Sequence, residues 1–178
     1  MRKHIRTAVA ATVLAAGAAL GGITAAGTAL ASDDTGYIDG TGGTTDDWRD
    51  EGALKQGDEG NAVALWQTVL VADGAKWTDK KNTKHDFTEN DIDGDFDSKT
   101  KSATKDWQAQ NGLSQTGKAD PKSFSVADNN LGKVGRKGYV TYDGDSDYNA
   151  RFKRLPLAGV AQQVYYVYVD GAWVEASY

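Results

Sequence analysis

The sequence predicts an α+β protein in which a small helical domain precedes a small antiparallel sheet. Apolar residues recur at helical spacing in two segments, residues 63–70 and 100–107, and a Trp-Gln pair accompanies each. Further along, aromatic and β-branched runs are separated by Asp170-Gly171, which is a strong signal for a two-residue hairpin turn. A basic and then apolar N-terminal segment precedes both regions.

Residues 1–31 predict a signal peptide that is cleaved on export. Three basic residues form a positive head, residues 8–31 are apolar and rich in Ala and Gly, and residues 29–31 (Ala-Leu-Ala) form a small-x-small cleavage site. An uncleaved membrane anchor is the alternative, because the apolar stretch exceeds a minimal signal core. Scattered Thr and Gly residues make it a weak spanning helix. We therefore expect a secreted or wall-associated protein that does not contact the membrane after cleavage.

The composition of the remaining chain excludes several classes of function. All 25 acidic residues but only 17 of the 20 basic ones follow residue 31, which leaves a net charge of about −8. A nucleic-acid binder needs a positive field for the phosphates, so we expect no nucleic-acid partner. The chain has no cysteine. The fold must therefore depend on its apolar core, and a cysteine nucleophile or a cysteine-ligated metal is excluded.

Residues 32–52 predict a flexible leader, because they are rich in Gly, Thr and Asp. We expect its Trp48 to dock on the domain that follows. That helical domain, residues 53–131, begins with a helix that starts near residues 58–61 and stops at Gly74. The polar stretch over residues 75–92 predicts a long surface loop.

Two similar turn–helix units should follow this loop. The second helix begins at Asp97 or Ser98 and ends at Gly112. The third begins at Asp120-Pro121, where Asp can cap free N–H groups and Pro suits the first helical position, and it extends to about residue 131. Both units share the pattern Asp-x-Lys-Ser/Thr at the helix start. We expect the two units to pack on the first helix.

Residues 132–178 predict a small aromatic β-module. Runs at residues 139–142, 164–169 and 172–178 have the composition of strands. A two-stranded hairpin is barely stable alone, so these strands should gain partners or pack on the helical domain.

The order of motifs in residues 53–131 resembles the peptidoglycan-binding domain of the small three-helix type, which is appended to bacterial cell-wall hydrolases. The matching positions are Val63, Trp66, Gln67, Leu70, Gly74, Asp93, Gly94, Phe96, Thr100, Ala103, Trp107, Gln108, Gly112 and Leu113. The resemblance implies a three-helix fold and non-catalytic attachment to peptidoglycan. The chain departs from the pattern at six positions: Trp66 and Trp107 stand for Leu and Phe, Asp97 and Asp120 for Gly, Ser98 for Pro, and Thr104 for an aliphatic residue.

The matched positions divide into a structural set and a ligand-binding set. The expected core is Val63, Trp66, Leu70, Phe96, Ala103, Trp107 and Leu113. The expected ligand-binding residues are Gln67, Asp93, Thr100 and Gln108, joined by Trp77, Tyr166 and Tyr168 as rings on which a sugar can stack. Structural roles compete with this prediction: the two glutamines can hydrogen-bond nearby backbone, Thr100 can cap a turn, and the tyrosines can pack a hairpin.

Catalytic and metal-binding alternatives are weaker. The acids from Asp91 to Asp97 suggest a calcium loop, but Thr100 stands where a bidentate Glu is needed. Only His85 follows the signal segment, which disfavours a zinc hydrolase, and no Gly-x-Ser-x-Gly elbow occurs. A two-carboxylate glycosidase stays open, although the β-module is small for such a site. We expect no catalytic residue, metal or cofactor.

The sequence as a whole predicts a secreted, non-catalytic protein whose partner is peptidoglycan. A protein of another class is the alternative: an inhibitor or assembly factor that binds another exported protein through the Tyr-rich sheet. A weak cell-wall hydrolase is the third hypothesis.

Overall fold

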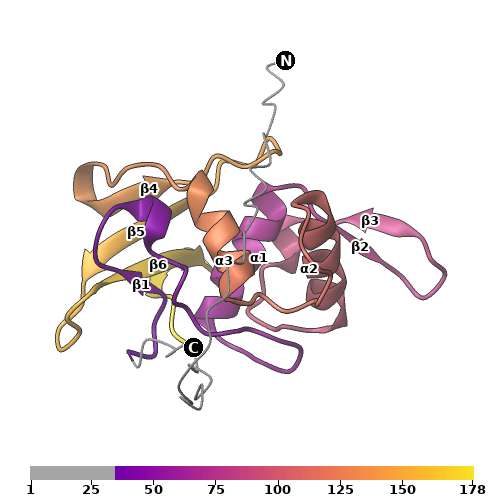
Figure 1. Cartoon of the computed structure of the whole chain (residues 1–178), viewed down its shortest axis with the longest axis horizontal. Coiled ribbons are helices and arrows are strands. Elements are labelled where there is room, and N and C mark those ends of the chain that lie inside the picture. The colour runs from indigo at the N-terminus through magenta and orange to yellow at the C-terminus, as the bar shows by residue number, and fades with distance from the viewer. Residues whose placement is uncertain (1–34) are drawn as a thin grey trace, which may run out of the picture.

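The computed structural model describes residues 35–178, so the expected signal peptide and residues 32–34 lie outside the described part. Three α-helices and two antiparallel sheets confirm the α+β class (Figure 1). The helices are α1 (Asn61–Ala72), α2 (Ser98–Gln110) and α3 (Pro121–Ala127). The strands are β1 (Asp39–Gly40), β2 (Lys76–Thr78), β3 (Lys84–Asp86), β4 (Tyr139–Thr141), β5 (Arg151–Pro156), β6 (Gln163–Val169) and β7 (Ala172–Glu175). Short 3₁₀ turns are η1 (Thr44–Asp46), η2 (Glu89–Asp91), η3 (Asp128–Asn130) and η4 (Arg136–Gly138).

Helices α2 and α3 begin where their capping residues predict. The Asp97 carboxylate accepts a hydrogen bond from Thr100 N at 2.8 Å, and that of Asp120 accepts one from Ser123 N at 2.9 Å. Pro121 occupies the first turn of α3, where its missing N–H costs nothing. The last helix stops at Ala127, and η3 continues the chain to the expected end of the domain.

The larger sheet has the order β1-β6-β5-β4, and β7 pairs with β6 beside β1. The predicted hairpin is confirmed as β6–β7, with Val169 opposite Ala172 and positive φ at both Asp170 (50°) and Gly171 (82°). Positive φ at both central residues is the signature of a type I′ turn. A bridge between Tyr37 and Ser177, with Tyr178 N donating to Gly36 O at 3.0 Å, brings the two ends of the described chain together.

The long surface loop expected over residues 75–92 is instead organised around a second hairpin, β2–β3. Its strands have three residues each and are largely charged, so they lack the β-branched runs that identify strands. The hairpin is stabilised by hydrogen bonds to α2 and not by strand propensity. Lys76 N donates to the Asp106 carboxylate at 3.0 Å, and Thr78 N donates to Ser102 Oγ at 2.9 Å. Phe87 then anchors the base of the hairpin in the core, at 3% exposed.

The flexible leader predicted over residues 32–52 is wrong for its described part. Asp39-Gly40 forms β1 on the large sheet, and Trp48 is fully buried against Phe124 of α3 and Tyr165 of β6, at ring separations of 6.2 and 5.3 Å. The Gly- and Asp-rich composition concealed this packing, because a few apolar side chains suffice to fix a short segment. The expected docking of Trp48 is confirmed.

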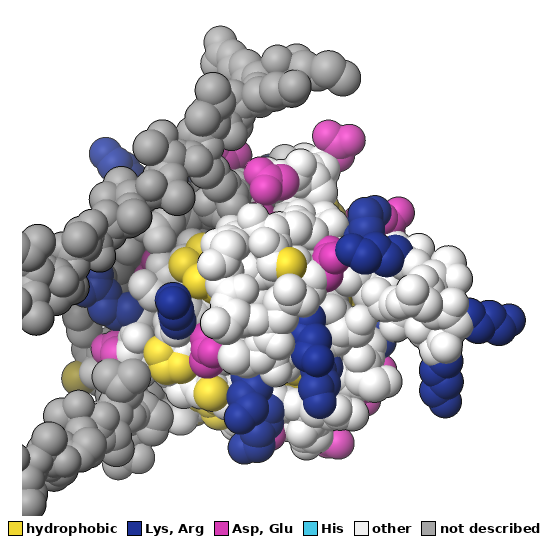
Figure 2. Space-filling model, turned by 45° about the vertical axis from the view of Figure 1, so that its right-hand side comes forward, with side chains coloured by type: hydrophobic (Ala, Val, Ile, Leu, Met, Phe, Trp, Pro, Cys, Tyr) yellow, Lys and Arg dark blue, Asp and Glu magenta, His cyan; other side chains and the backbone are white. Residues whose placement is uncertain are grey.

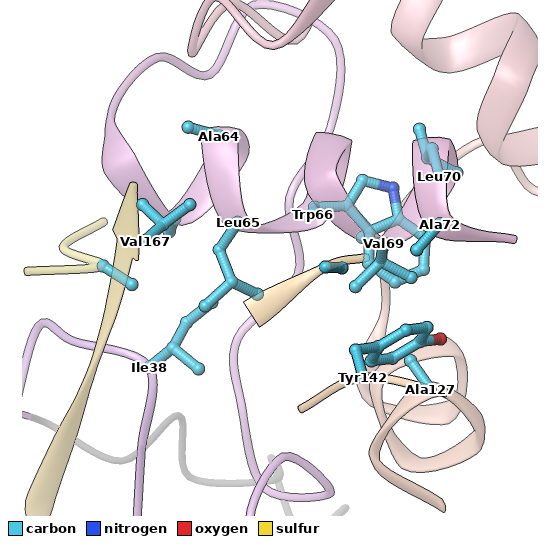
Figure 3. Close-up of a cluster of buried hydrophobic side chains, with 14 of the residues drawn as sticks. Ile38, Ala64, Leu65, Trp66, Val69, Leu70, Ala72, Ala127, Tyr142 and Val167 are labelled. Carbon is cyan, nitrogen blue, oxygen red and sulfur yellow. The ribbon is translucent and has the colours of Figure 1, made fainter. Parts of the chain in front are cut away.

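One hydrophobic core runs continuously through the helices and the sheet. In Figure 3, Leu65 of α1 points toward Ile38 and Val167, while Val69 points toward Tyr142. Six of the seven residues expected in the core are buried: Trp66, Leu70 and Trp107 are 0% exposed, and the rings of Trp66 and Trp107 meet edge-to-face at 5.0 Å. Leu113 is the one expected core residue that is only partly buried. Within residues 35–178, the helices are too short or too polar to span a membrane.

Candidate functional site

The glutamine of each Trp-Gln pair hydrogen-bonds the backbone of the turn that precedes the next helix. Gln67 Oε1 accepts hydrogen bonds from Asp93 N at 3.1 Å and Gly94 N at 2.8 Å. Its Nε2 donates to the Asp93 carboxylate at 2.8 Å and to Thr100 Oγ1 at 3.1 Å. Gly94 has φ of +78° and lies against the backbone of Gly60, so a side chain there would be strained. The amide therefore fixes the turn that leads into α2.

Gln108 repeats this arrangement one unit later. Its Oε1 accepts from Gly117 N at 2.9 Å, while its Nε2 donates to Lys118 O at 2.8 Å and Ser123 Oγ at 3.0 Å. Gly117 also has a left-handed backbone, with φ of +67°. The predicted internal repeat is thus a structural repeat: a buried amide, a glycine turn and an Asp-capped helix.

This geometry changes the interpretation of the predicted ligand-binding residues from the motif. Gln67, Thr100 and Gln108 are at most 1% exposed, and the polar atoms of their side chains hydrogen-bond within the fold. They form the scaffold and do not reach a surface from which a wall polymer could contact them. Asp93 is exposed, but its carboxylate accepts from Gln67 and from Asp95 N at 2.9 Å. The structural alternative accounts for all four.

The tryptophans that depart from the family pattern bring two indole N–H groups into the core, and each finds a partner. Trp66 Nε1 donates to Thr104 Oγ1 at 3.0 Å, and Trp107 Nε1 donates to the Asp73 carboxylate at 2.6 Å. A buried N–H without an acceptor costs about 1–3 kcal/mol. Thr104, which stands for an aliphatic residue of the family pattern, therefore supplies the acceptor that the Trp66 indole needs.

The acidic residues that suggested a calcium loop are engaged within the fold. Asp91 pairs with Lys99 at 2.5 Å, Asp93 supports its own turn, and Asp97 caps α2. In the described part of the chain, no three or more His, Cys, Asp or Glu side chains are grouped so that they could hold a metal ion.

A first surface cleft, of about 370 Å³, lies where the β2–β3 hairpin meets the start of α2. It is lined by Trp77, Thr78, Asp79, Lys80, Ser98 and Lys99. His85 stacks on Trp77 with ring centroids 4.6 Å apart, and the Lys99 ammonium lies 4.8 Å from the centre of the same indole. The faces of Trp77 are therefore largely occupied by its neighbours. The cleft offers the ammonium groups of Lys80 and Lys99 and two hydroxyls beside an aromatic edge, although Lys99 is paired with Asp91 and Asp79 adds a carboxylate to the lining. Its ammonium and hydroxyl groups suit an anionic group better than a stacked sugar.

A second cleft, of about 760 Å³, lies between the other side of the hairpin and the 146–149 loop. It is lined by Val71, Gly74, Lys76, Asp86, Phe87, Thr88, Glu89, Ser146, Asp147, Tyr148 and Asn149. Lys76 forms an ion pair with Asp86 on its wall. Figure 2 turns this end of the molecule toward the reader: charged groups of both signs are scattered over it, and hydrophobic side chains show only in small patches.

The outer side of the large sheet carries four rings and one lysine, which together we call the aromatic face: Tyr139, Tyr166, Tyr168, Trp173 and Lys153. The strand register places them on one side, because Tyr139 pairs with Lys153, Lys153 with Tyr166, and Tyr168 with Trp173. Tyr165, one residue away, faces the core and is 0% exposed. The structure thus brings the predicted Tyr166 and Tyr168 together.

Sequence reasoning missed Tyr139, Lys153 and Trp173 on this face. A signal for Trp173 was present, since a two-residue turn at Asp170-Gly171 fixes Tyr168 opposite Trp173. The positions of Tyr139 and Lys153 on this face depend on how β4 and β5 pair within the sheet, and no short-range sequence pattern specifies that pairing.

A buried acidic seam joins the N-terminal segment to the rest of the fold. Burial raises the pKa of Glu51 to about 8, although Asp39 N and the Tyr178 hydroxyl donate to its carboxylate at 2.7 and 2.8 Å. Burial likewise raises the pKa of Asp128 to about 7. These acids are enclosed by the core and line none of the clefts described above, so we assign them to stability.

Comparison with known proteins identifies one family. Residues 81–126 match the family described as putative peptidoglycan binding domain, which confirms the resemblance over α2 and most of α3. No curated protein and no solved structure matches the chain.

Proposed function

We propose that this chain is an exported, non-catalytic protein that attaches to cell-wall peptidoglycan through its helical region. The observation that carries the proposal is the match of residues 81–126 to a peptidoglycan-binding family. The turn–helix repeat supplies a rigid scaffold with its polar groups satisfied internally, and such a scaffold can hold a surface cleft in one shape.

The Trp77 cleft is the best-placed contact in this region. Lys99 and Ser98 belong to the family-matched segment, and Lys80 lies just before it. Peptidoglycan stem peptides carry carboxylates, which the Lys80 ammonium and the cleft hydroxyls can bind through charge-assisted hydrogen bonds. Lys99 is paired with Asp91, so its ammonium would be shared between Asp91 and the ligand. In this proposal the cleft holds a stem-peptide carboxylate, and no covalent bond is made or broken.

Sedimentation with purified sacculi tests the proposal. The protein that begins at Ser32 is incubated with sacculi, and the pelleted fraction and the released muropeptides are both measured. Pelleting without release supports attachment. Release of muropeptides would show a hydrolase, and the absence of pelleting would refute wall attachment.

The internal repeat provides a matched control for the cleft. Lys99 and Lys122 occupy equivalent positions in the two Asp-x-Lys-Ser/Thr units, but only Lys99 lines the cleft. Lys99→Met should weaken sacculus binding about tenfold, as expected for the loss of a charge-assisted contact worth about 1.5–3 kcal/mol. Lys122→Met should leave it within about twofold of wild type. Equal effects of the two variants would rule out this cleft.

A further inference from the structure

Exposed aromatic side chains gather on one surface of the molecule. Among residues 35–178, four large hydrophobic side chains are prominently exposed: Val134, Tyr139, Tyr168 and Tyr178. Two of the four belong to the aromatic face, and Tyr168 is the most exposed, at 54%. Exposed rings that form a contiguous patch mark interaction surfaces, whereas singly exposed apolar side chains do not.

The rings of the aromatic face support one another. Trp173 contacts Tyr168 at a centroid distance of 5.3 Å and Tyr139 at 5.6 Å. The Lys153 ammonium lies 4.5 Å from the Trp173 ring and 5.0 Å from the Tyr139 ring. Because these contacts restrict the rings before any ligand arrives, little side-chain entropy remains to be lost on binding.

The charge on this face is locally positive in an otherwise acidic protein. Lys153 and Arg151 follow each other on the outer side of β5, and neither forms an ion pair with a described residue. The one acid in the row, Glu175, lies opposite Tyr166. The chain as a whole has a net charge of −5. A ligand for this face should therefore combine apolar ring surfaces with hydrogen-bond acceptors and carry no positive charge.

A polar pocket of about 460 Å³ continues from the aromatic face. Its walls include Thr141 and Arg151, which pair with each other one step along from Tyr139 and Lys153 on the same side of the sheet. Asn129, Asn130 and Asn149 supply amide groups, and Asp143 adds a carboxylate. The Nδ2 atoms of Asn129 and Asn130 donate to Ser125 O and to the Tyr142 hydroxyl. Amides and hydroxyls next to exposed rings suit the N-acetyl and hydroxyl groups of an amino sugar whose apolar face stacks on an aromatic ring.

We infer that the aromatic face and its adjoining pocket form a second wall-binding site, which binds the glycan strand of peptidoglycan. The inference rests on the proposed function, but it assigns the sugar chain to the sheet and the stem peptide to the Trp77 cleft. Figure 1 shows the large sheet and the β2–β3 hairpin at opposite ends of the molecule. One protein can therefore hold the polymer at two places, and simultaneous binding raises the overall affinity without any new contact.

Separated ligands test the inference. Glycan strands freed of peptide by an amidase, and a synthetic stem peptide, are titrated by calorimetry against the protein that begins at Ser32. Tyr168→Ala and Lys153→Met should each weaken glycan binding about 5- to 10-fold and leave stem-peptide binding unchanged. Lys99→Met should show the opposite pattern. Lys122→Met changes an exposed lysine that lines neither site and is the control; circular dichroism verifies folding of each variant.

The outcomes separate this inference from the proposed function. If wild type pellets with sacculi but Tyr168→Ala and Lys153→Met bind glycan strands as tightly as wild type, the sheet site is refuted and wall attachment stands. If wild type does not pellet, the proposed function fails and the sheet site fails with it. A wild-type dimer that dissociates in Tyr168→Ala would assign the face to a second copy of the chain and would also overturn the glycan site.

Discussion

The helical region and the outer side of the large sheet use the same kinds of side chain in opposite ways. In the helices, Trp66 and Gln67 are fully buried and hydrogen-bonded to neighbouring groups. On the sheet, Tyr168 is 54% exposed and Trp173 lies beneath it as support. The Trp-Gln pairs are thus scaffold, whereas the groups best suited to a polymer lie outside the motif. Five substitutions test this contrast.

The largest effect should come from the centre of the helical core. Trp66→Ala removes a ring that contacts Trp107 and Phe124, and it leaves Thr104 without its indole partner. Substitution of a buried Trp by Ala costs about 3–5 kcal/mol of unfolding free energy. Chemical denaturation followed by circular dichroism measures this loss. A loss below about 1 kcal/mol would show that the core is not built around this ring.

The two glutamine-supported turns should differ in a predictable order. Gln67→Ala deprives two backbone N–H groups of their acceptor, at about 1–3 kcal/mol each, and should cost about 2–6 kcal/mol. Gln108→Ala deprives one, that of Gly117, and should cost about 1–3 kcal/mol. The exposed Gln110→Ala is the control. Denaturation midpoints in the reverse order would contradict the assigned roles.

The seam between the N-terminal segment and the sheet should make stability depend on pH. Burial raises the pKa of Glu51 to about 8, so the folded state holds this proton while the unfolded chain releases it near 4.5. The folded state then binds more protons over this range, and stability falls as pH rises through about 8. Glu51→Gln should remove about 4 kcal/mol of the decline between pH 5 and pH 9, because the difference between the unfolded and folded pKa contributes about 1.4 kcal/mol per pKa unit.

The control for this pH dependence is Glu59→Gln, which changes an exposed acid. Its stability should decline with pH as that of wild type does. A decline that is equally steep in Glu51→Gln would assign the effect to other groups.

The smallest effect on stability should come from the aromatic face. Because Tyr168 is more than half exposed, Tyr168→Ala should change the free energy of unfolding by less than about 0.5 kcal/mol. A loss above about 1.5 kcal/mol would mean that the ring holds the sheet together, and the contrast with Trp66 would disappear.

The elements with strong local signals were predictable from the sequence. Apolar spacing around Trp66 and Trp107 predicted α1 and α2, the Asp97 and Asp120 caps placed the helix starts, and Asp170-Gly171 predicted β6–β7. The β2–β3 hairpin was missed because its strands form through contacts with Ser102 and Asp106 of α2, which are distant in sequence. For the same reason, β1 could not be inferred from its composition.

The candidate site was predictable only in part. The motif predicted Gln67 and Gln108 as ligand-binding residues, because a family pattern includes positions that the fold needs as well as positions that bind. The burial of their side chains distinguishes the two roles, and a sequence does not show it. Tyr166 and Tyr168 were identified by residue type, but Lys153 and Tyr139 join them only through the pairing of β4, β5 and β6. Strand order in a sheet is set by long-range packing, which a single sequence does not reveal.

The bridge between Tyr37 and Ser177 turns the folded part into a nearly closed ring, since residues 36 and 178 are hydrogen-bonded neighbours. A few added residues could join them, and the cut could be moved to the exposed tip of the β2–β3 hairpin, where circular permutation is best tolerated. Because its two ends are close, this unit could also be inserted into a loop of another protein without moving the two ends of that loop far apart.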